Sequence, residues 1–169
     1  KDSFGISLNL KLVIEIILST IIAYWLYADL KIHFVHVPFF GVFDISVFYI
    51  AFAAFIITAF ANAVNITDGL DGLATGVLTI ALASFWIIAA SIIDVPTALF
   101  IGIWLGGLIA FLYFNIPPAR IFLGDSGSLS FGASFAVVGL ILGKSFSLPI
   151  IGGVFLIEII SSSVQLLSK

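Results

Sequence analysis

Long apolar runs separated by short polar connections are the feature that most constrains how this chain folds. A helix that crosses a bilayer needs about 20 mostly apolar residues, and about six runs of that length follow one another. They cover residues about 12–28, 45–64, 72–93, 97–114, 127–143 and 147–167. Of the 169 residues, 62% are hydrophobic and only 9% are charged, whereas a soluble domain carries about 25% charged residues. The sequence therefore predicts an all-α, polytopic transmembrane helix bundle, with a single domain over residues 1–169.

The connections between the runs contain helix-breaking residues. Proline removes a backbone donor and clashes with the preceding helical turn. The breaks after the third run are Asp94-Val95-Pro96, Pro117-Pro118 and Ser147-Leu148-Pro149. The first connection, about 29–44, is longer and is expected to form a loop. Glycines four residues apart indicate close helix packing; these pairs are Gly102 with Gly106 and Gly139 with Gly143.

Two short acidic segments lie where one apolar run stops and the next begins. They are residues 62–72, with Asp68 and Asp71, and residues 122–128, with Asp125. Consecutive spans alternate in direction, so both segments are expected on one membrane face. An exposed carboxylate in hydrocarbon costs several kcal/mol, so carboxylates gathered at a membrane boundary indicate a polar reaction site.

The distribution of basic residues indicates which face this is. The face with the acidic segments also carries Lys1, Lys11, Arg120 and Lys169, and the opposite face carries Lys31 and Lys144. Cytoplasmic connections carry an excess of lysine and arginine. The site is therefore expected to face the cytoplasm. Because the chain has no cysteine, disulfides and thiolate metal sites are excluded.

The first acidic segment combines carboxylates with amides. Asp68 and Asp71 are three residues apart, a spacing that places both on one face if the segment is helical. Asn62 and Asn65 repeat that spacing. Hard oxygen ligands of this kind suit Mg²⁺ or a sugar nucleotide. The alternative is simple capping, with Thr67 or Asp68 as the N-cap of the third span.

The second acidic segment opens the fifth span. A helix N-terminus favours a phosphate, but Asp125 would repel it unless a cation lies between them. Mg²⁺ bridging the carboxylate and a diphosphate removes that conflict. The alternative is an N-cap role for Asp125 or Ser126. Nearby, Arg120 is equally suited to a phosphate or to membrane anchoring, and Phe122 is by physical chemistry alone better suited to interfacial anchoring.

Ionisable residues inside the spans are functional candidates. Glu15 lies near the cytoplasmic end of its span and is expected to extend toward Lys11. Glu158, with Ser161, Ser162 and Ser163 after it, forms a polar stripe that suits either interhelical bonding or a cavity wall.

The acidic motifs resemble those of the polyprenyl-phosphate N-acetylhexosamine-1-phosphate transferase family. The matching stretches are Asn-Ala-Val-Asn-Ile-Thr-Asp-Gly-Leu-Asp-Gly-Leu-Ala at 62–74 and Pro-Ala-Arg-Ile-Phe-Leu-Gly-Asp-Ser-Gly-Ser-Leu at 118–129. The resemblance implies that Asp125 binds Mg²⁺ and that Asp68 and Asp71 serve the nucleotide-sugar pocket, all three in the catalytic set. It also implies substrate-binding roles for residues outside that set, with Phe122 stacking on uracil instead of anchoring. These residues are Asn65, Phe122, Asn115 and Gln165.

The same resemblance implies a reaction and its partners. Thr67, the stretch 152–158 with Gln165, and Val-Pro-Phe-Phe at 37–40 favour UDP-MurNAc-pentapeptide as the donor and undecaprenyl phosphate as the acceptor. Lipid I and UMP are then the products, in the bacterial cytoplasmic membrane. Relatives that transfer GlcNAc-1-phosphate share the wording at 124–128, so UDP-GlcNAc remains an alternative donor. We expect no nucleic-acid partner. We do expect a homodimer, because the family is often dimeric.

The sequence also departs from the family pattern. The family has an adjacent aspartate pair before this region, a histidine-rich loop after it, and about ten spans, so the chain is expected to be a central fragment that is inactive alone. A cation channel or transporter is a further alternative. Its acidic residues should line a path through the bilayer, whereas Asp68, Asp71 and Asp125 are expected on one face.

Overall fold

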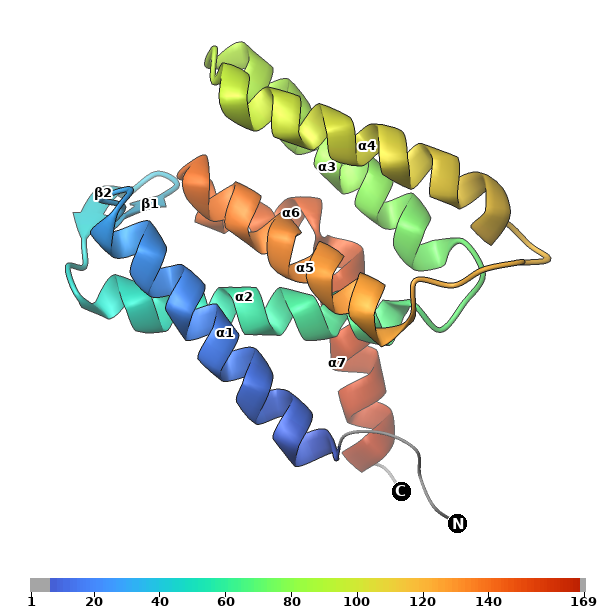
Figure 1. Ribbon diagram of the computed structural model, residues 1–169. Coiled ribbons are helices and arrows are strands. Elements are labelled where there is room, and N and C mark those ends of the chain that lie inside the picture. The colour runs from blue at the N-terminus through green and yellow to red at the C-terminus, as the bar shows by residue number, and fades with distance from the viewer. Residues whose placement is uncertain (1–6, 168–169) are drawn as a thin grey trace.

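The computed structural model describes residues 7–167, without the side chains at 163 and 165–167. Helices dominate it, and a short hairpin follows the first helix (Figure 1). The elements are α1 (Leu8–Ala28), β1 (Phe34–Val37), β2 (Gly41–Asp44), α2 (Phe48–Thr67), α3 (Leu73–Ser91), α4 (Val95–Asn115), α5 (Gly124–Ile141), the 3₁₀ turn η1 (Ser145–Ser147), α6 (Leu148–Ile151) and α7 (Gly153–Leu167).

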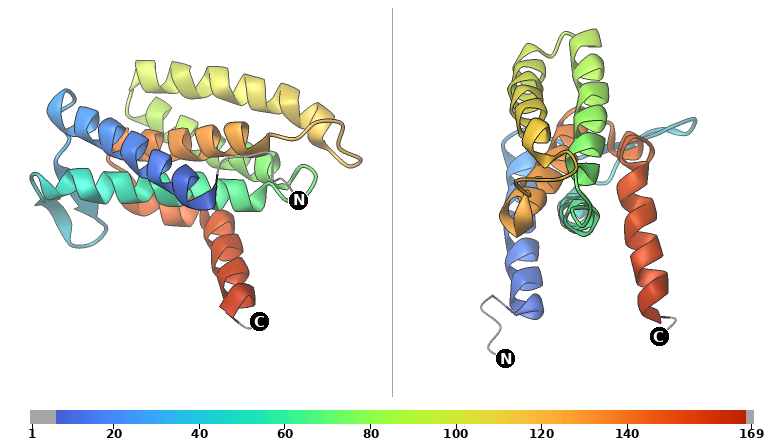
Figure 2. Two further views of the ribbon diagram at one scale, coloured as in Figure 1. Left: turned by 60° about the horizontal axis from the view of Figure 1, so that its bottom comes forward. Right: turned by 90° about the vertical axis from the view of Figure 1, so that its right-hand side faces the viewer.

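Helix α2 lies at the centre of the bundle. It packs against α1, α5 and α7, while α3 and α4 form a separate antiparallel pair beside it (Figures 1 and 2). Its buried side chains include Ala53, Ile57, Phe60 and Val64, which recur at helical spacing and face the neighbouring helices. Helix α7 turns away from the other helices in both views of Figure 2.

An aromatic cluster joins four helices in the core. Phe135 of α5 is fully buried, and its ring centroid lies 5.4 Å from that of Phe60 in α2, 5.3 Å from that of Phe85 in α3 and 6.2 Å from that of Phe155 in α7. Tilted and edge-on ring pairs of this kind stabilise a core beyond their buried area. The cluster fixes α5, and with it the acidic segment at its start, relative to α2.

Helices α2 and α5 make a close backbone contact at Gly132. A Cβ atom added there would lie 2.5 Å from the Phe60 carbonyl oxygen and 2.8 Å from the Ala61 Cα. A side chain larger than hydrogen does not fit between them. The four-residue glycine spacing is only partly a guide to such contacts: Gly139 does pack tightly on Leu148, but at Gly106 nothing in the described chain lies within 4 Å.

The polytopic all-α class is confirmed. Within the described residues, 4 helices are long and apolar enough to cross a membrane, namely α1 to α4, or up to 5 if the bent pair 145–151 and 153–162 is one span. The predicted span at 127–143 is present as α5 but begins with Gly124-Asp125-Ser126-Gly127-Ser128, and these polar and small residues lower its hydropathy. The prediction of about six spans was therefore too high by this measure.

The predicted span at 147–167 is not one straight helix. Its two parts meet at an angle of 71°, around Gly152, where an added Cβ would lie 2.8 Å from the Phe60 ring and 2.9 Å from the Leu148 carbonyl oxygen. Pro149 follows Leu148 in the first turn of α6, where proline is tolerated but the preceding chain cannot continue as a helix.

The first connection also differs from the prediction of a plain loop, since β1 and β2 pair antiparallel, with Phe34 opposite Asp44 and Val37 opposite Gly41.

Candidate active site between the two acidic loops

Direct hydrogen bonds join the two acidic segments. The Gly124 backbone N–H donates to Asp68 Oδ2 at 3.0 Å, and the Ala119 N–H donates to Asp71 Oδ2 at 2.9 Å. Each bond links the α2–α3 connection to the α4–α5 connection. The two segments therefore lie together in the fold, as a shared membrane face would require.

The first acidic segment begins as the last turns of α2, but Asp68 and Asp71 lie in the turn that follows. Helix α2 ends at Thr67, Asp68 is its C-cap, and α3 begins only after Gly72. Gly72 is the N-cap of α3 with a φ of 74° and makes no side-chain capping bond, which suits a residue without Cβ. The predicted helical face shared by Asp68 and Asp71, and the alternative in which Thr67 or Asp68 caps the third span, were both wrong.

The second acidic segment opens α5 as expected, but without capping. Leu123 is the N-cap and makes no side-chain capping bond, while Asp125 lies in the first turn. The capping alternative for Asp125 and Ser126 was therefore wrong as well. The Asp125 carboxylate is instead free to bind groups outside its own helix.

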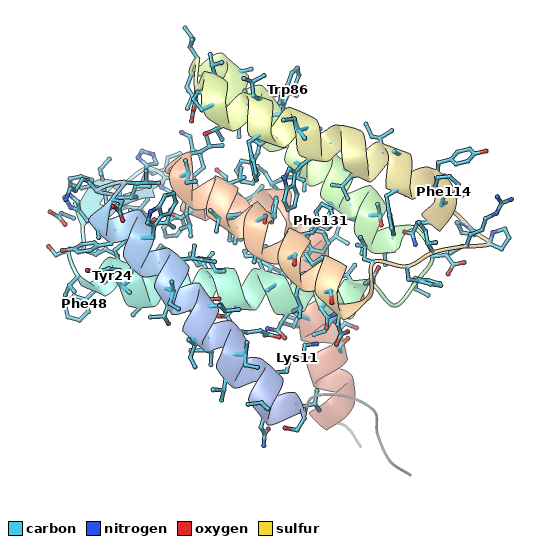
Figure 3. All side chains as sticks on the ribbon, in the orientation of Figure 1. Lys11, Tyr24, Phe48, Trp86, Phe114 and Phe131 are labelled. Carbon is cyan, nitrogen blue, oxygen red and sulfur yellow. The ribbon has the colours of Figure 1, made fainter. Side chains whose placement is uncertain are left out.

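Asp125 contacts side chains from two other helices. Lys11 Nζ of α1 lies 2.9 Å from Asp125 Oδ2, and Asn65 Nδ2 of α2 donates to Asp125 Oδ1 at 3.2 Å and to Ser128 Oγ at 2.7 Å. Lys11 also donates to Asn65 Oδ1 at 3.3 Å. Figure 3 shows Lys11 beside the start of α5. The sequence indicated Lys11 as a basic residue of that face and as a partner of Glu15, but not of Asp125, because no local spacing relates residues so far apart along the chain.

Asp68 has an unusual environment for a carboxylate. Partial burial is the main cause that raises its pKa above the ordinary value, the Gly124 N–H bond opposes this, and the nearby Asp125 charge adds to it. Asp71 is exposed. The two aspartates of the first segment therefore differ in solvation, although both hold the opposite loop.

Glu15 pairs with Asn62 and not with Lys11. Asn62 Nδ2 donates to Glu15 Oε2 at 2.6 Å and to the Thr58 carbonyl oxygen at 3.0 Å. The expectation that Glu15 extends toward Lys11 was wrong, because Lys11 is engaged by Asp125 and Asn65. Among the described residues, Glu15 Oε1 is buried without a hydrogen-bond partner.

Asn115 supports the loop that carries Phe122. It is 1% exposed; its Oδ1 accepts from Thr75 Oγ1 at 2.8 Å, and its Nδ2 donates to the Ile121 carbonyl oxygen at 2.8 Å. The next residue, Phe122, is exposed, which leaves its ring available for stacking. Its stacking role and a substrate contact by Asn115 stay predictions.

Two sites named from the sequence lie toward the C-terminus. The side chain of Gln165 lies outside the described residues, so its predicted binding role stays a prediction. Glu158 is partly buried in α7, and the choice between interhelical bonding and a cavity wall stays open.

A groove of about 730 Å³ extends from the Lys11–Asp125 pair along the bundle. Its polar lining is Lys11, Glu15, Ser19, Asp125, Ser126, Ser130 and Ser134. Its apolar lining comes from α1, α2 and α5, with Ile14, Leu18 and Ile57 among it. One end is thus charged and the remainder largely apolar.

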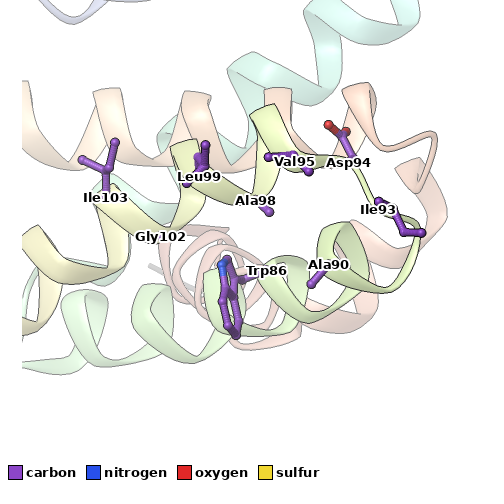
Figure 4. A pocket seen from close by; sticks show the side chains of 9 residues that line it. All are labelled: Trp86, Ala90, Ile93, Asp94, Val95, Ala98, Leu99, Gly102 and Ile103. Carbon is purple, nitrogen blue, oxygen red and sulfur yellow. The ribbon is translucent and has the colours of Figure 1, made fainter.

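Another groove, of about 560 Å³, lies between α3 and α4 near their connection (Figure 4). Trp86, Leu99 and Ile103 make it strongly apolar. Its one acidic residue, Asp94, caps α4 by accepting from the Thr97 N–H at 3.2 Å. None of the site residues predicted from the sequence lines this groove.

Comparison with known proteins assigns the chain to a family. The family model described as glycosyl transferase family 4 matches residues 1–143, which is most of the chain. The chain belongs to glycosyl transferase family 4. Both acidic loops of the site, and the Lys11–Asp125 pair, fall inside the matched region.

Several curated relatives carry the same name. The phospho-N-acetylmuramoyl-pentapeptide-transferase of Caldanaerobacter subterraneus subsp. tengcongensis is 40% identical over 99% of this chain and 53% of that protein. Those of Lactobacillus helveticus and Limosilactobacillus fermentum are 37% and 46% identical, over 99% and 75% of this chain and 52% and 40% of those proteins. The chain spans about half the length of the curated relatives it matches.

Proposed function

We propose that the protein transfers phospho-MurNAc-pentapeptide from UDP-MurNAc-pentapeptide to undecaprenyl phosphate, giving lipid I and UMP. The observation that carries the proposal is the pair of acidic loops hydrogen-bonded to each other at the charged end of a groove that is otherwise largely apolar. A polar donor and a lipid acceptor can meet at such a place. The name of the relatives supports this choice of donor.

In the proposed reaction, an oxygen of the lipid phosphate attacks the sugar-proximal phosphorus of the donor. The bond from that phosphorus to the bridging oxygen breaks, and UMP leaves with the bridging oxygen. The protein's main task in such a transfer is to position the reactants and stabilise charge. Asp68 and Asp71 serve the nucleotide-sugar pocket, together with Asn65 and the Phe122 ring. Asn115 and Gln165 complete the proposed pocket.

The residues around Asp125 fit a magnesium ion that is shared with substrate. The Asp125 carboxylate is exposed at the start of α5, beside the Asn65 amide oxygen. Within residues 7–167 no group of three acidic, histidine or cysteine side chains could hold a metal. Mg²⁺ is commonly held by one or two carboxylates, waters and substrate phosphates. Asp125 would hold it, and the ion would neutralise diphosphate charge.

The groove suits the lipid acceptor. Its apolar walls on α1 and α5 match a polyprenyl chain, and its charged end matches a phosphate. We propose that this end faces the cytoplasm in the bacterial inner membrane, following the lysine and arginine distribution. We also propose that the protein forms a homodimer, on the basis of the family resemblance.

The test is UMP release by the whole protein in proteoliposomes. We expect release with UDP-MurNAc-pentapeptide, dependence on undecaprenyl phosphate, and loss on EDTA treatment. Asp125→Asn should lower the rate by at least about a hundredfold, since electrostatic stabilisation of this kind is worth several kcal/mol. The matched control is Asp29→Asn, which changes an exposed carboxylate after α1 and should leave the rate unchanged.

Two results would overturn parts of the proposal. Preferential release from UDP-GlcNAc would replace the donor. Cation flux through the protein without any UMP release would favour the channel alternative over the enzyme.

A further inference from the structure

Lys11 occupies the same carboxylate oxygen that a metal ion would need. Its ammonium lies 2.9 Å from Asp125 Oδ2 and 3.3 Å from Asn65 Oδ1. These two oxygens come from α5 and α2, while Lys11 reaches them from α1. Lys11 thus brings a positive charge to the mouth of the groove.

A divalent ion and this ammonium repel each other. Mg²⁺ binds a carboxylate oxygen at about 2.0–2.1 Å, and a positive ammonium at hydrogen-bonding distance from the same oxygen would be repelled by it. The remaining Asp125 oxygen, Oδ1, accepts from Asn65 Nδ2 at 3.2 Å. Metal binding at Asp125 is therefore opposed by the charge of Lys11 and is favoured when Lys11 moves away.

Lys11 has a second acceptor within reach. Glu15 is one helical turn further along α1, and side chains four residues apart lie on the same helix face. Both residues line the groove, and Glu15 Oε1 is buried without a hydrogen-bond partner in the described part of the chain. The four-carbon stem of lysine carries its charge through such a distance by rotation of single bonds.

We propose that Lys11 is an exchangeable counter-ion: a divalent cation binding to Asp125 releases its ammonium into the groove, toward Glu15 and the phosphate of an entering lipid. The metal and lipid sites are thereby coupled through one side chain. This inference rests on the proposed function, because it takes Asp125 as the metal ligand and the groove as the lipid site.

The first test measures metal affinity and not activity. Mn²⁺ binding to the purified whole protein is followed by electron paramagnetic resonance, with Mg²⁺ as competitor. Lys11→Met removes the competing ammonium and should tighten Mn²⁺ binding roughly two- to fivefold. Lys11→Arg keeps the charge and should not tighten it. Lys144→Met, which removes a lysine beyond the far end of α5, should change it less than twofold.

The outcomes separate the two claims. If Lys11→Met binds Mn²⁺ as wild type does or more weakly, Lys11 does not compete and the inference is overturned. If Asp125→Asn binds Mn²⁺ as wild type does, the metal assignment itself is wrong, and the inference falls with it.

A second test measures the coupling. Binding of dodecyl phosphate is titrated calorimetrically with and without Mg²⁺, in wild type, Lys11→Met and Lys144→Met. We expect Mg²⁺ to strengthen binding in wild type and Lys144→Met, and this enhancement to shrink by at least about threefold in Lys11→Met. An equal enhancement in all three proteins would exclude the coupling of the metal and lipid sites through Lys11.

A separate observation concerns the hairpin at the opposite end of the bundle. Its turn and second strand expose large apolar side chains, with Phe39 fully exposed and Phe40 79% exposed. Phe39 also adopts a φ of 69°, a conformation that glycine or asparagine adopts more readily than a bulky residue. A turn facing only water gives no reason for two adjacent phenylalanines.

The hairpin adjoins exposed apolar surface of the bundle. It is held between α1, which ends at Ala28, and α2, which begins at Phe48, and both are long and apolar enough to span a membrane. Tyr24 and Phe48, labelled near the hairpin in Figure 3, are 60% and 76% exposed. At its base the polar groups pair with each other, since His33 Nδ1 lies 3.0 Å from Asp44 Oδ1 and this bond is the main cause that lowers the pKa of Asp44.

We infer that the hairpin tip inserts into the interfacial layer of the bilayer, on the face opposite the acidic loops. Its occupant is lipid, because aromatic side chains favour that depth and the two spanning helices hold the tip there.

The absence of cysteine from this chain makes a clean test available. A nitroxide attached to Phe40→Cys in proteoliposomes should show at least about twofold greater accessibility to oxygen than to a water-soluble nickel complex. The same label at Asp29→Cys, an exposed residue beside the hairpin base, should show the reverse. Greater access of nickel at position 40 overturns the inference, as does strong spin–spin broadening that indicates a second copy of the chain.

Discussion

Replacing Gly132 with alanine tests the packing that positions Asp125. The new Cβ would lie 2.5 Å from the Phe60 carbonyl oxygen and 2.8 Å from the Ala61 Cα. Both are backbone atoms, so neither can rotate away as the end of a flexible side chain could. Bringing this contact even to 3.0 Å requires the helices to separate by about 0.5 Å. Overpacking of a core typically costs about 1–3 kcal/mol, and the better helix propensity of alanine offsets about 0.5–1 kcal/mol of it. We expect a net loss of about 1–2 kcal/mol of unfolding free energy.

This loss is measurable by thermal unfolding in detergent. For a chain of this size 1 kcal/mol corresponds to about 2–4 °C, so Tm should fall by roughly 2–8 °C. The separation also reaches the site, because Ser128 lies one turn before Gly132 and holds Asn65 through a 2.7 Å bond. UMP release should therefore fall together with Tm.

Gly106→Ala is the matched control. It makes the same substitution inside a helix, but nothing in the described chain lies within 4 Å of the added Cβ. Its Tm should be unchanged or slightly higher, since alanine is the better helix former. A Gly132→Ala protein as stable as Gly106→Ala would refute the close contact between α2 and α5.

Further predictions concern the loops of the site. Thr75→Val removes the buried donor to Asn115 Oδ1 and should cost about 1–3 kcal/mol in thermal unfolding. Phe122→Ala should raise the KM for the UDP donor by at least about fivefold, as loss of one base-stacking contact predicts, while Phe122→Trp should largely retain it. Asp68→Asn removes a partly buried charge, so Tm should not fall, whereas UMP release should. Because the pKa of Asp68 is raised, it becomes protonated at a higher pH than an ordinary aspartate. As the pH is lowered, the rate of UMP release should therefore begin to fall at a higher pH than in a reaction governed by an exposed aspartate. Asp68→Asn should remove this part of the pH dependence.

The helices and the meeting of the acidic loops could be predicted from the sequence. Apolar runs of bilayer length gave the helices at 48–67, 73–91 and 95–115 to within a few residues, because such runs have few ways to satisfy their backbone groups in lipid. Alternation of spans then brought Asp68 to Gly124, the first residue of α5. That prediction needed only the number of crossings between the loops.

The remaining contacts depend on tertiary packing. Lys11 and Asp125 form a pair although they are 114 residues apart in the sequence, and no local pattern relates them. Likewise Gly132 belongs to no four-residue glycine pair, yet it makes a closer backbone approach than Gly106. At the bend, Gly152 lies so close to the Phe60 ring that a Cβ atom would not fit, and that ring belongs to another helix.

The two bonds between the acidic loops use only half of each carboxylate. Asp68 and Asp71 each accept a backbone N–H through Oδ2, and in the described part of the chain no hydrogen bond to either Oδ1 is present. A donor substrate can therefore bind to the second oxygen without breaking the link between the loops. The conformational entropy of ordering these loops is lost when the chain folds and not when the nucleotide arrives, so more of each contact with the nucleotide contributes to affinity.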